Sequence, residues 1–260
     1  MEVTRSRRAL LDAFRRVVAP ELREQGFRGR DGHFVRRRRD IIHVIELQLS
    51  IYGGRVTANL GLDLPWLPPA IRWIDPPKLG PHAHDSTRWI RVGLTGPEPA
   101  DRWWTFLSDA EEDQIGAARG VGGAILEHGI DWLDAEADRT AFLRHARERV
   151  DRSRSPSRPE GRFPELRLLA GVLAWNGRFD EAAEILELAR AGWEDERGRL
   201  ALARAEFGAR YPGTPAARAA PDLVGELERL ISPTTGEFVA AQHGPGRRAP
   251  RRRSPSERPG

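Results

Sequence analysis

The sequence predicts an α+β protein with an antiparallel meander sheet of about four to five strands, a long N-terminal helix on one face of that sheet, and an all-α helical segment after it. Three observations lead to this prediction. Residues 41–62 form two β-rich runs around a glycine pair, residues 5–25 carry apolar side chains at helical spacing, and residues 162–232 are dominated by helical patterns.

The central stretch is predicted to be a β-hairpin closed by Gly53-Gly54, because both central residues of a two-residue primed turn need positive φ. Side chains alternate across a strand, so counting outward from this turn sorts the cross-strand pairs into two faces. The expected apolar pairs are Ile51/Val56, Leu49/Ala58, Leu47/Leu60 and Ile45/Leu62, and the expected polar pairs are Ser50/Thr57, Gln48/Asn59 and Glu46/Gly61.

The rest of the first 151 residues supplies the neighbours of this hairpin. A continuous helix is expected over about 5–25, a short hairpin around Asp31-Gly32, and a long proline-rich loop after Leu62 that packs in part through Trp66 and Trp73. The other expected elements are a strand at 88–94 and helices at 101–117, 120–134 and 137–150.

We divide the chain into four parts: an α+β domain (1–151), a Pro/Ser/Arg linker (152–161), helical hairpins (162–232), and a disordered basic tail (233–260). The first helical hairpin resembles one tetratricopeptide unit, and further helices are expected at 195–211 and 216–231. The residues that carry the tetratricopeptide resemblance are Ala170, Gly171, Leu173, Gly177, Phe179, Ala182, Ala183 and Leu186.

Composition limits the function further. The chain has no cysteine, so disulfides and thiolate metal sites are excluded, and we expect a cytoplasmic protein with no membrane segment. The formal net charge of +4 is concentrated at the two ends of the chain, where arginines dominate. The almost exclusive use of Arg over Lys suggests a GC-rich bacterial genome, which weakens any functional interpretation of arginine runs.

The first part of the chain resembles the bacterial family called "domain of unknown function 4304" over roughly residues 8–150. This resemblance implies a small α+β domain and brings no assigned activity or catalytic residue. The matching residues are Leu22, Gly26-Phe27, Phe34, Ile42, Val44-Ile45, Leu47-Gln48, Ser50, Val56-Thr57, Asn59-Leu60-Gly61, Trp89-Ile90-Arg91-Val92-Gly93 and Trp103-Trp104.

The polar face of the hairpin is the surface where we look for a binding site. Its row of side chains is Glu46, Gln48, Ser50, Thr57 and Asn59, which Trp89 and Arg91 extend if the strand at 88–94 pairs alongside. The simpler interpretation is that this face is the solvated outer surface of a one-sided sheet. The functional interpretation is a polar recognition surface partly covered by the proline-rich loop.

Other polar clusters are weaker candidates. His82 and His84 lie beside Asp85 and could contribute to a metal site with His33, His43 or Glu46, but an exposed polar turn explains them as well. The glycine-rich run 116–123 lacks the residues of a phosphate loop, so we expect it to break a helix and permit close packing. Glu111-Glu112-Asp113 is expected to be a solvated helix surface. We therefore assign no catalytic residue, metal or cofactor.

Three functions remain open from the sequence. We favour a non-catalytic module that binds another protein, such as an immunity or accessory factor. The alternative is a small enzyme or ligand-binding protein that uses the polar sheet face and the His82/His84 loop. A third is nonspecific association of the arginine-rich tail, or of Arg36–Arg39, with anions or nucleic acid.

Overall fold

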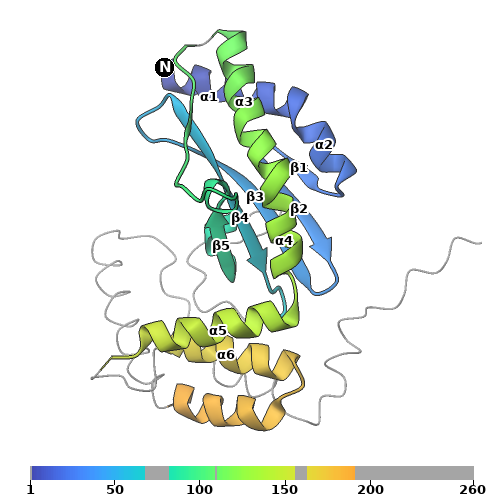
Figure 1. Cartoon of the computed structure of the whole chain (residues 1–260), viewed down its shortest axis with the longest axis vertical. Coiled ribbons are helices and arrows are strands. Elements are labelled where there is room, and N and C mark those ends of the chain that lie inside the picture. Colours follow the sequence, from blue (N-terminus) through green and yellow to red (C-terminus); the bar gives the residue numbers. More distant parts are fainter. Residues whose placement is uncertain (1, 68–81, 109, 156–162, 191–260) are drawn as a thin grey trace, which may run out of the picture.

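The computed structural model describes residues 2–67, 82–108, 110–155 and 163–190, and it contains an antiparallel sheet and a set of helices in the predicted α+β arrangement (Figure 1). The elements in chain order are α1 (Glu2–Val17), α2 (Ala19–Glu24), β1 (Arg28–Arg30), β2 (His33–Arg38), β3 (Ile41–Leu49), β4 (Arg55–Asp63), β5 (Arg88–Arg91), β6 (Trp104–Thr105), α3 (Glu111–Ala124), α4 (Ile130–Glu136), α5 (Arg139–Ser153) and α6 (Phe163–Trp175).

The strands pair in the order β1-β2-β3-β4-β5, and the two-residue strand β6 pairs with β4 near its start. The helices α3 and α4 run along the strands, whereas α5 and α6 cross one end of the sheet (Figure 1). Phe14 of α1 contacts Phe34 of β2, with ring centroids 5.9 Å apart, so the N-terminal helix covers the apolar sheet face as predicted. The predicted fold class is therefore confirmed.

The β3–β4 hairpin forms, but its register differs by two residues from the predicted one. Leu49 lies opposite Val56, so the loop contains four residues, 51–54, instead of two. Both glycines have positive φ, as predicted, but they occupy the second half of the loop, after a turn in which the Gly53 N–H donates to the Ser50 carbonyl at 3.0 Å. A shift of two residues keeps every paired side chain on its predicted face. Only Ile51 leaves the apolar face, and it lies in the loop.

The N-terminal helix is divided in two. Helix α1 ends at Val17, Val18 is the N-cap of α2, and Pro20 lies in the first turn of α2. A proline is tolerated in the first turn but disrupts a helix interior, because it lacks the N–H donor and its ring collides with the preceding turn. The prediction of one continuous helix is therefore wrong at this point. The predicted hairpin around Asp31-Gly32 is confirmed as β1–β2, and both turn residues have positive φ.

The described residues 101–108 and Ala110 are not helical, which contradicts the first part of the predicted helix at 101–117. Trp104 instead pairs with Val56 as part of β6, and α3 begins only at Glu111. The indole of Trp104 lies against Gly120 of α3, where an added Cβ would come within 2.3 Å of the Trp104 ring. Trp104 therefore belongs to the sheet and packs against α3.

The glycine-rich run 116–123 lies inside α3 and does not break it. Its close-packing role is confirmed, because an added Cβ at Gly122 would lie 2.4 Å from a methyl group of Val18. A single π-helical turn, Ile125–Gly129, then leads into α4. The predicted strand at 88–94 is shorter than expected, since β5 ends at Arg91 and a 3₁₀ turn follows.

The helices after α4 form a layer that packs against the first part of the chain. Helix α5 contacts α6, and a further helix covers residues 179–190. Helix α6 ends at Trp175 and is followed by a Schellman motif with Gly177 at positive φ, in which the Arg178 N–H donates to the Leu173 carbonyl at 3.0 Å. The Trp175 ring lies 5.6 Å from the Trp66 ring, and its Nε1–H donates to Asp40 at 3.1 Å.

Several predictions fall on residues that the structure does not describe. These are most of the proline-rich loop (68–81), most of the linker, the helices expected at 195–211 and 216–231, and the basic tail. They stay predictions.

Candidate functional site

The predicted polar row exists as a continuous strip across three strands. Glu46 lies opposite Asn59, and Gln48 lies opposite Thr57. Strand β5 pairs alongside β4, which places Arg91 opposite Asn59 and Trp89 opposite Gly61. The structure therefore brings together Glu46, Gln48, Asn59, Trp89 and Arg91 on one face of the sheet.

This face is not a plain solvated surface, because other segments cover its centre. Thr57 is fully buried, and its hydroxyl donates to the Arg102 carbonyl at 3.0 Å. Ala83 and Ser86 lie over Gly61, where an added Cβ would come within 2.5 Å of the Ser86 oxygen. The interpretation of the polar face as a solvated outer surface is wrong along β4. It agrees better with the structure toward β3.

Glu46 anchors the histidine loop to the sheet. One carboxylate oxygen of Glu46 lies 2.7 Å from Nδ1 of His82, and the other accepts the backbone N–H of Ala83 at 3.0 Å. The His84 ring stacks on the His82 ring with centroids 5.4 Å apart, and the centroid of the His33 ring lies 5.9 Å from that of His82. Three imidazoles and one carboxylate therefore gather at the edge of the polar strip.

The chemistry available to this cluster is limited by its geometry. Within the described residues, no group of three or more His, Asp or Glu side chains is arranged to hold a metal ion. In a neutral imidazole, an Nδ1–H donated to Glu46 leaves Nε2 as an acceptor, and this arrangement suits recognition of a donor or assistance with a proton transfer. His82 and His84 are both partly exposed, so the cluster lies on the surface and not in an enclosed cavity.

Gln48, Asn59 and Arg91 are engaged with protein groups. The side-chain amide of Asn59 donates to Gln48 at 3.0 Å. Arg91 forms an ion pair with Asp101, and its guanidinium lies 5.3 Å from the ring centre of Trp103. The Nη1 group of Arg91 is engaged by Asp101, so the contacts give no support for a direct binding role of this group.

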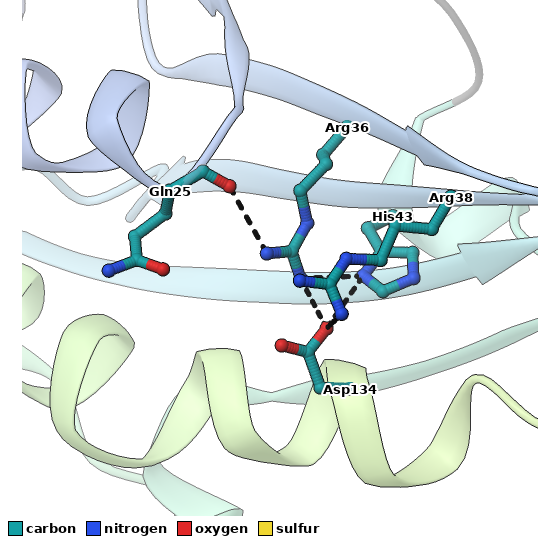
Figure 2. A network of polar contacts seen from close by, with 5 residues as sticks. All are labelled: Gln25, Arg36, Arg38, His43 and Asp134. Atoms are coloured by element: carbon teal, nitrogen blue, oxygen red, sulfur yellow. Dashed lines mark hydrogen bonds and ion pairs between the residues drawn. The ribbon is translucent and has the colours of Figure 1, made fainter.

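A buried polar network lies on the opposite, apolar face of the sheet, and the sequence did not reveal it. Figure 2 shows Arg36 of β2 between Gln25, His43 and Asp134. The guanidinium donates to the Asp134 carboxylate at 2.6 Å, to Nδ1 of His43 at 3.0 Å and to the Gln25 carbonyl at 3.2 Å. Only 5% of Arg36 is exposed. Arg36 is therefore a structural residue and not the phosphate contact that its place in the run 36–39 suggested.

This network changes the ionisation of its members. Burial, together with the positive charges of Arg36 and Arg38, lowers the pKa of His43 to about 3. Burial also lowers the pKa of Arg36, while Asp134 opposes that effect. His43 is therefore a neutral imidazole in the folded protein near neutral pH, and its Nδ1 accepts from Arg36.

Two further surface features were not predicted. The hairpin loop exposes Ile51 and Tyr52 almost completely, at 88% and 92%, and Leu107 is 88% exposed. The two segments that carry these residues lie side by side, because the Phe106 N–H donates to the Gly54 carbonyl at 2.9 Å. We call Ile51, Tyr52 and Leu107 the hairpin tip. The second feature is a cleft of about 690 Å³ beside β5 and the end of α5.

The described residues thus define an α+β domain in which helices cover one face of an antiparallel sheet and short loops partly cover the other. Residues 18–135 match the model of a family described as "Domain of unknown function (DUF4304)". This match confirms the domain within narrower bounds than the resemblance suggested, from the end of α1 to α4. Comparisons with curated proteins and with solved structures gave no match. Among the described helices, none is long and apolar enough to cross a membrane.

Proposed function

We propose that this protein is a non-catalytic bacterial module of the cytoplasm that binds another protein through the hairpin tip. The observation that carries the proposal is the exposure of three large apolar side chains, Ile51, Tyr52 and Leu107, on two adjacent segments. Isolated exposed apolar residues are ordinary, whereas a group of them on one projection is typical of an interaction surface.

The hairpin tip is held in place by the backbone around it. The Ser50 N–H donates to the Arg55 carbonyl at 3.0 Å, which closes the loop, and Phe106 is bonded to Gly54 on the adjacent segment. A surface that is ordered before binding loses little conformational entropy when a partner docks, which favours affinity. Tyrosine is also enriched among the residues that dominate binding energy at protein interfaces.

The helical layer offers a second contact for the same partner. Helix α6 and the helix at 179–190 are joined by a short turn, and their sequence resembles a tetratricopeptide unit. Phe179 and Leu188 on the second helix are partly exposed. This similarity supports an accessory or immunity role, in which the partner contacts both the α+β domain and the helices.

Site-specific photo-crosslinking tests the proposal. A photoreactive phenylalanine analogue at Tyr52 in source cells is expected to give one discrete adduct with a different protein, and the same analogue at the exposed position Arg37 serves as the control. The purified partner should then bind the purified chain, and the triple variant Ile51→Ser, Tyr52→Ser, Leu107→Ser should lose at least tenfold in affinity with an unchanged circular dichroism spectrum. Adducts only between copies of this chain, or equal affinity of the triple variant, would overturn the proposal.

A second function is favoured by the pairing of Glu46 with His82. A surface imidazole that is oriented by a carboxylate can bind a small polar ligand or assist a proton transfer. The variant His82→Gln should abolish any small-molecule turnover or binding of the purified protein, whereas His128→Gln, at a partly exposed histidine elsewhere, should not. Equal behaviour of the two variants would remove this candidate.

A further inference from the structure

The cleft beside β5 is formed by three elements that are distant in sequence. Thr87, Arg88 and Trp89 form one wall, His145 and Arg149 of α5 form the second, and Glu165 of α6 closes one side. Its volume of about 690 Å³ lies within the range of small-molecule sites in proteins. An inorganic anion alone would leave most of this space empty.

Four of the ten residues that line the cleft are arginines. Arg88, Arg149, Arg152 and Arg154 line it, against a single lining carboxylate, Glu165. Two of these arginines are neutralised from outside the cleft, because Arg88 pairs with Glu136 and Arg154 pairs with Asp151. Arg149 pairs with Glu165 inside the cleft, and Arg152 is the lining arginine that has no ion pair within the described residues.

Arg149 and Arg152 differ in how they are held. Arg149 donates to Glu165 at 3.1 Å and to the Thr87 carbonyl at 3.4 Å, so its guanidinium is fixed between β5 and α6. The Nε–H of Arg152 donates to the Glu148 carbonyl at 3.2 Å, while its Nη1 and Nη2 groups make no hydrogen bond within the described residues. Arg149 is thus oriented in advance, and Arg152 has two donors left for a ligand.

Arginines at the end of a helix have an ordinary explanation, because cations stabilise the negative end of the helix dipole. That explanation accounts for Arg152 in the last turn of α5 but not for Arg88, which comes from β5. The helix dipole also does not account for the environment of His145. Burial and the positive charges of Arg88, Arg149 and Arg152 lower the pKa of His145 to about 4. The imidazole therefore lies in a positive potential that several elements produce together.

Trp89 adds an aromatic surface at the rim of the cleft. It is 47% exposed although its strand pairs with β4, so part of the indole is open to solvent. Aromatic side chains in this position stack on planar rings, and each such contact with a nucleobase is worth about 1–3 kcal/mol. Arginine forks match phosphate oxygens in geometry and charge.

We propose that the cleft binds a small molecule that carries a phosphate monoester and a planar ring, of the nucleoside monophosphate class. Arg149 and Arg152 contact the phosphate, and Trp89 stacks on the ring. His145, as a neutral imidazole, is within the same cleft and donates or accepts one hydrogen bond. This site is independent of the hairpin tip.

Isothermal titration calorimetry of the full chain with AMP, GMP, CMP and UMP tests the proposal, with adenosine and inorganic phosphate as comparison ligands. At least one monophosphate should bind at least tenfold more tightly than either comparison ligand, because only the monophosphate meets both the arginines and Trp89. The proposal is overturned if no monophosphate binds at millimolar concentration. It is also overturned if inorganic phosphate binds as tightly as the best nucleotide, which would show nonspecific anion binding.

Matched variants locate the site. Arg152→Gln should weaken nucleotide binding about tenfold, since a hydrogen bond to a charged group is lost. Arg147→Gln removes the same charge from the same helix outside the cleft, and it should leave binding unchanged. Trp89→Thr should weaken nucleotide binding but not phosphate binding. Equal effects of Arg152→Gln and Arg147→Gln would mean that only net charge matters, and would overturn the assignment.

A spectroscopic readout separates ligand contact from a structural effect. Bound phosphate places negative charge beside His145, so its pKa, followed by the NMR shift of its ring protons, should rise on addition of the best nucleotide. The His128 resonances serve as the internal control, because this histidine lies elsewhere. Unchanged titration of His145 at saturating nucleotide would exclude binding in this cleft.

Discussion

Arg36 donates to Nδ1 of His43 across the β2–β3 pair at 3.0 Å, and burial together with the charges of Arg36 and Arg38 keeps this fully buried histidine neutral. The same guanidinium reaches Asp134 on α4, so a single side chain joins two strands to a helix.

Acid should destabilise the protein through His43. Its pKa is about 3 in the folded chain and about 6.5 in an unfolded one. Between these values the unfolded chain binds a proton that the folded chain does not, so the free energy of unfolding falls as the pH falls, by up to about 1.4 kcal/mol per pH unit. Urea unfolding at several pH values measures this slope, and His43→Gln should reduce it, while the part that comes from His145 remains. Equal slopes for both proteins would contradict the assignment.

Removing the partner of Arg36 should be costly. Asp134→Ala leaves a buried guanidinium without its carboxylate, and a loss of about 3 kcal/mol in the free energy of unfolding is expected. Asp151→Ala is the control, because it breaks an exposed pair with Arg154 on a helix surface, where a change within about 0.5 kcal/mol is expected. Similar losses in the two variants, by chemical denaturation, would show that Asp134 is not a structural partner.

Glu46 should control the order of the histidine loop. The variant Glu46→Ala removes the acceptor of the Ala83 N–H and of His82, so hydrogen exchange at the Ala83 amide should accelerate. Gln48→Ala, two residues along the same strand, breaks only the side-chain bond with Asn59 and should leave that amide unchanged. Exchange that is equally slow in wild type and Glu46→Ala would show that other contacts hold the loop.

Two glycines of α3 should respond in opposite directions to alanine. At Gly122 the added methyl would lie 2.4 Å from the stiff Val18 side chain, so a loss of about 1–3 kcal/mol in the free energy of unfolding is expected. At Gly116 an added Cβ meets nothing within 4 Å, and the higher helix propensity of alanine should raise stability by about 0.5–1 kcal/mol. Thermal unfolding of both variants provides the comparison, and destabilisation by both would refute the packing argument.

The sequence predicted the faces of the sheet better than its register. Alternation in β3 and β4 places side chains on the correct face whether the loop holds two or four residues, because both registers share the same parity. The number of residues in the loop depends on a local turn at Ser50 and Gly53, which competes with the two-residue alternative and leaves no separate signal in the pattern.

The errors at Trp103-Trp104 and in the polar network have a common physical origin. Trp104 pairs with Val56 because Gly120 leaves space for its ring, and that space is created by a helix that follows later in the chain. Arg36 and Asp134 are 98 residues apart, so their contact exists only once α4 lies on the sheet. Local patterns cannot encode such pairings, and a run of four arginines gave no sign that one of them turns inward.

Strand β1 limits how other chains can associate with the edge of the sheet. It is three residues long, lies at the edge of the sheet, and presents Arg28 and Arg30 to solvent. Short, positively charged edge strands discourage the addition of a foreign strand, which is the common route from a sheet to intermolecular aggregation. A binding partner that approaches this edge therefore gains little from backbone pairing, and recognition on this side of the molecule has to depend on side chains.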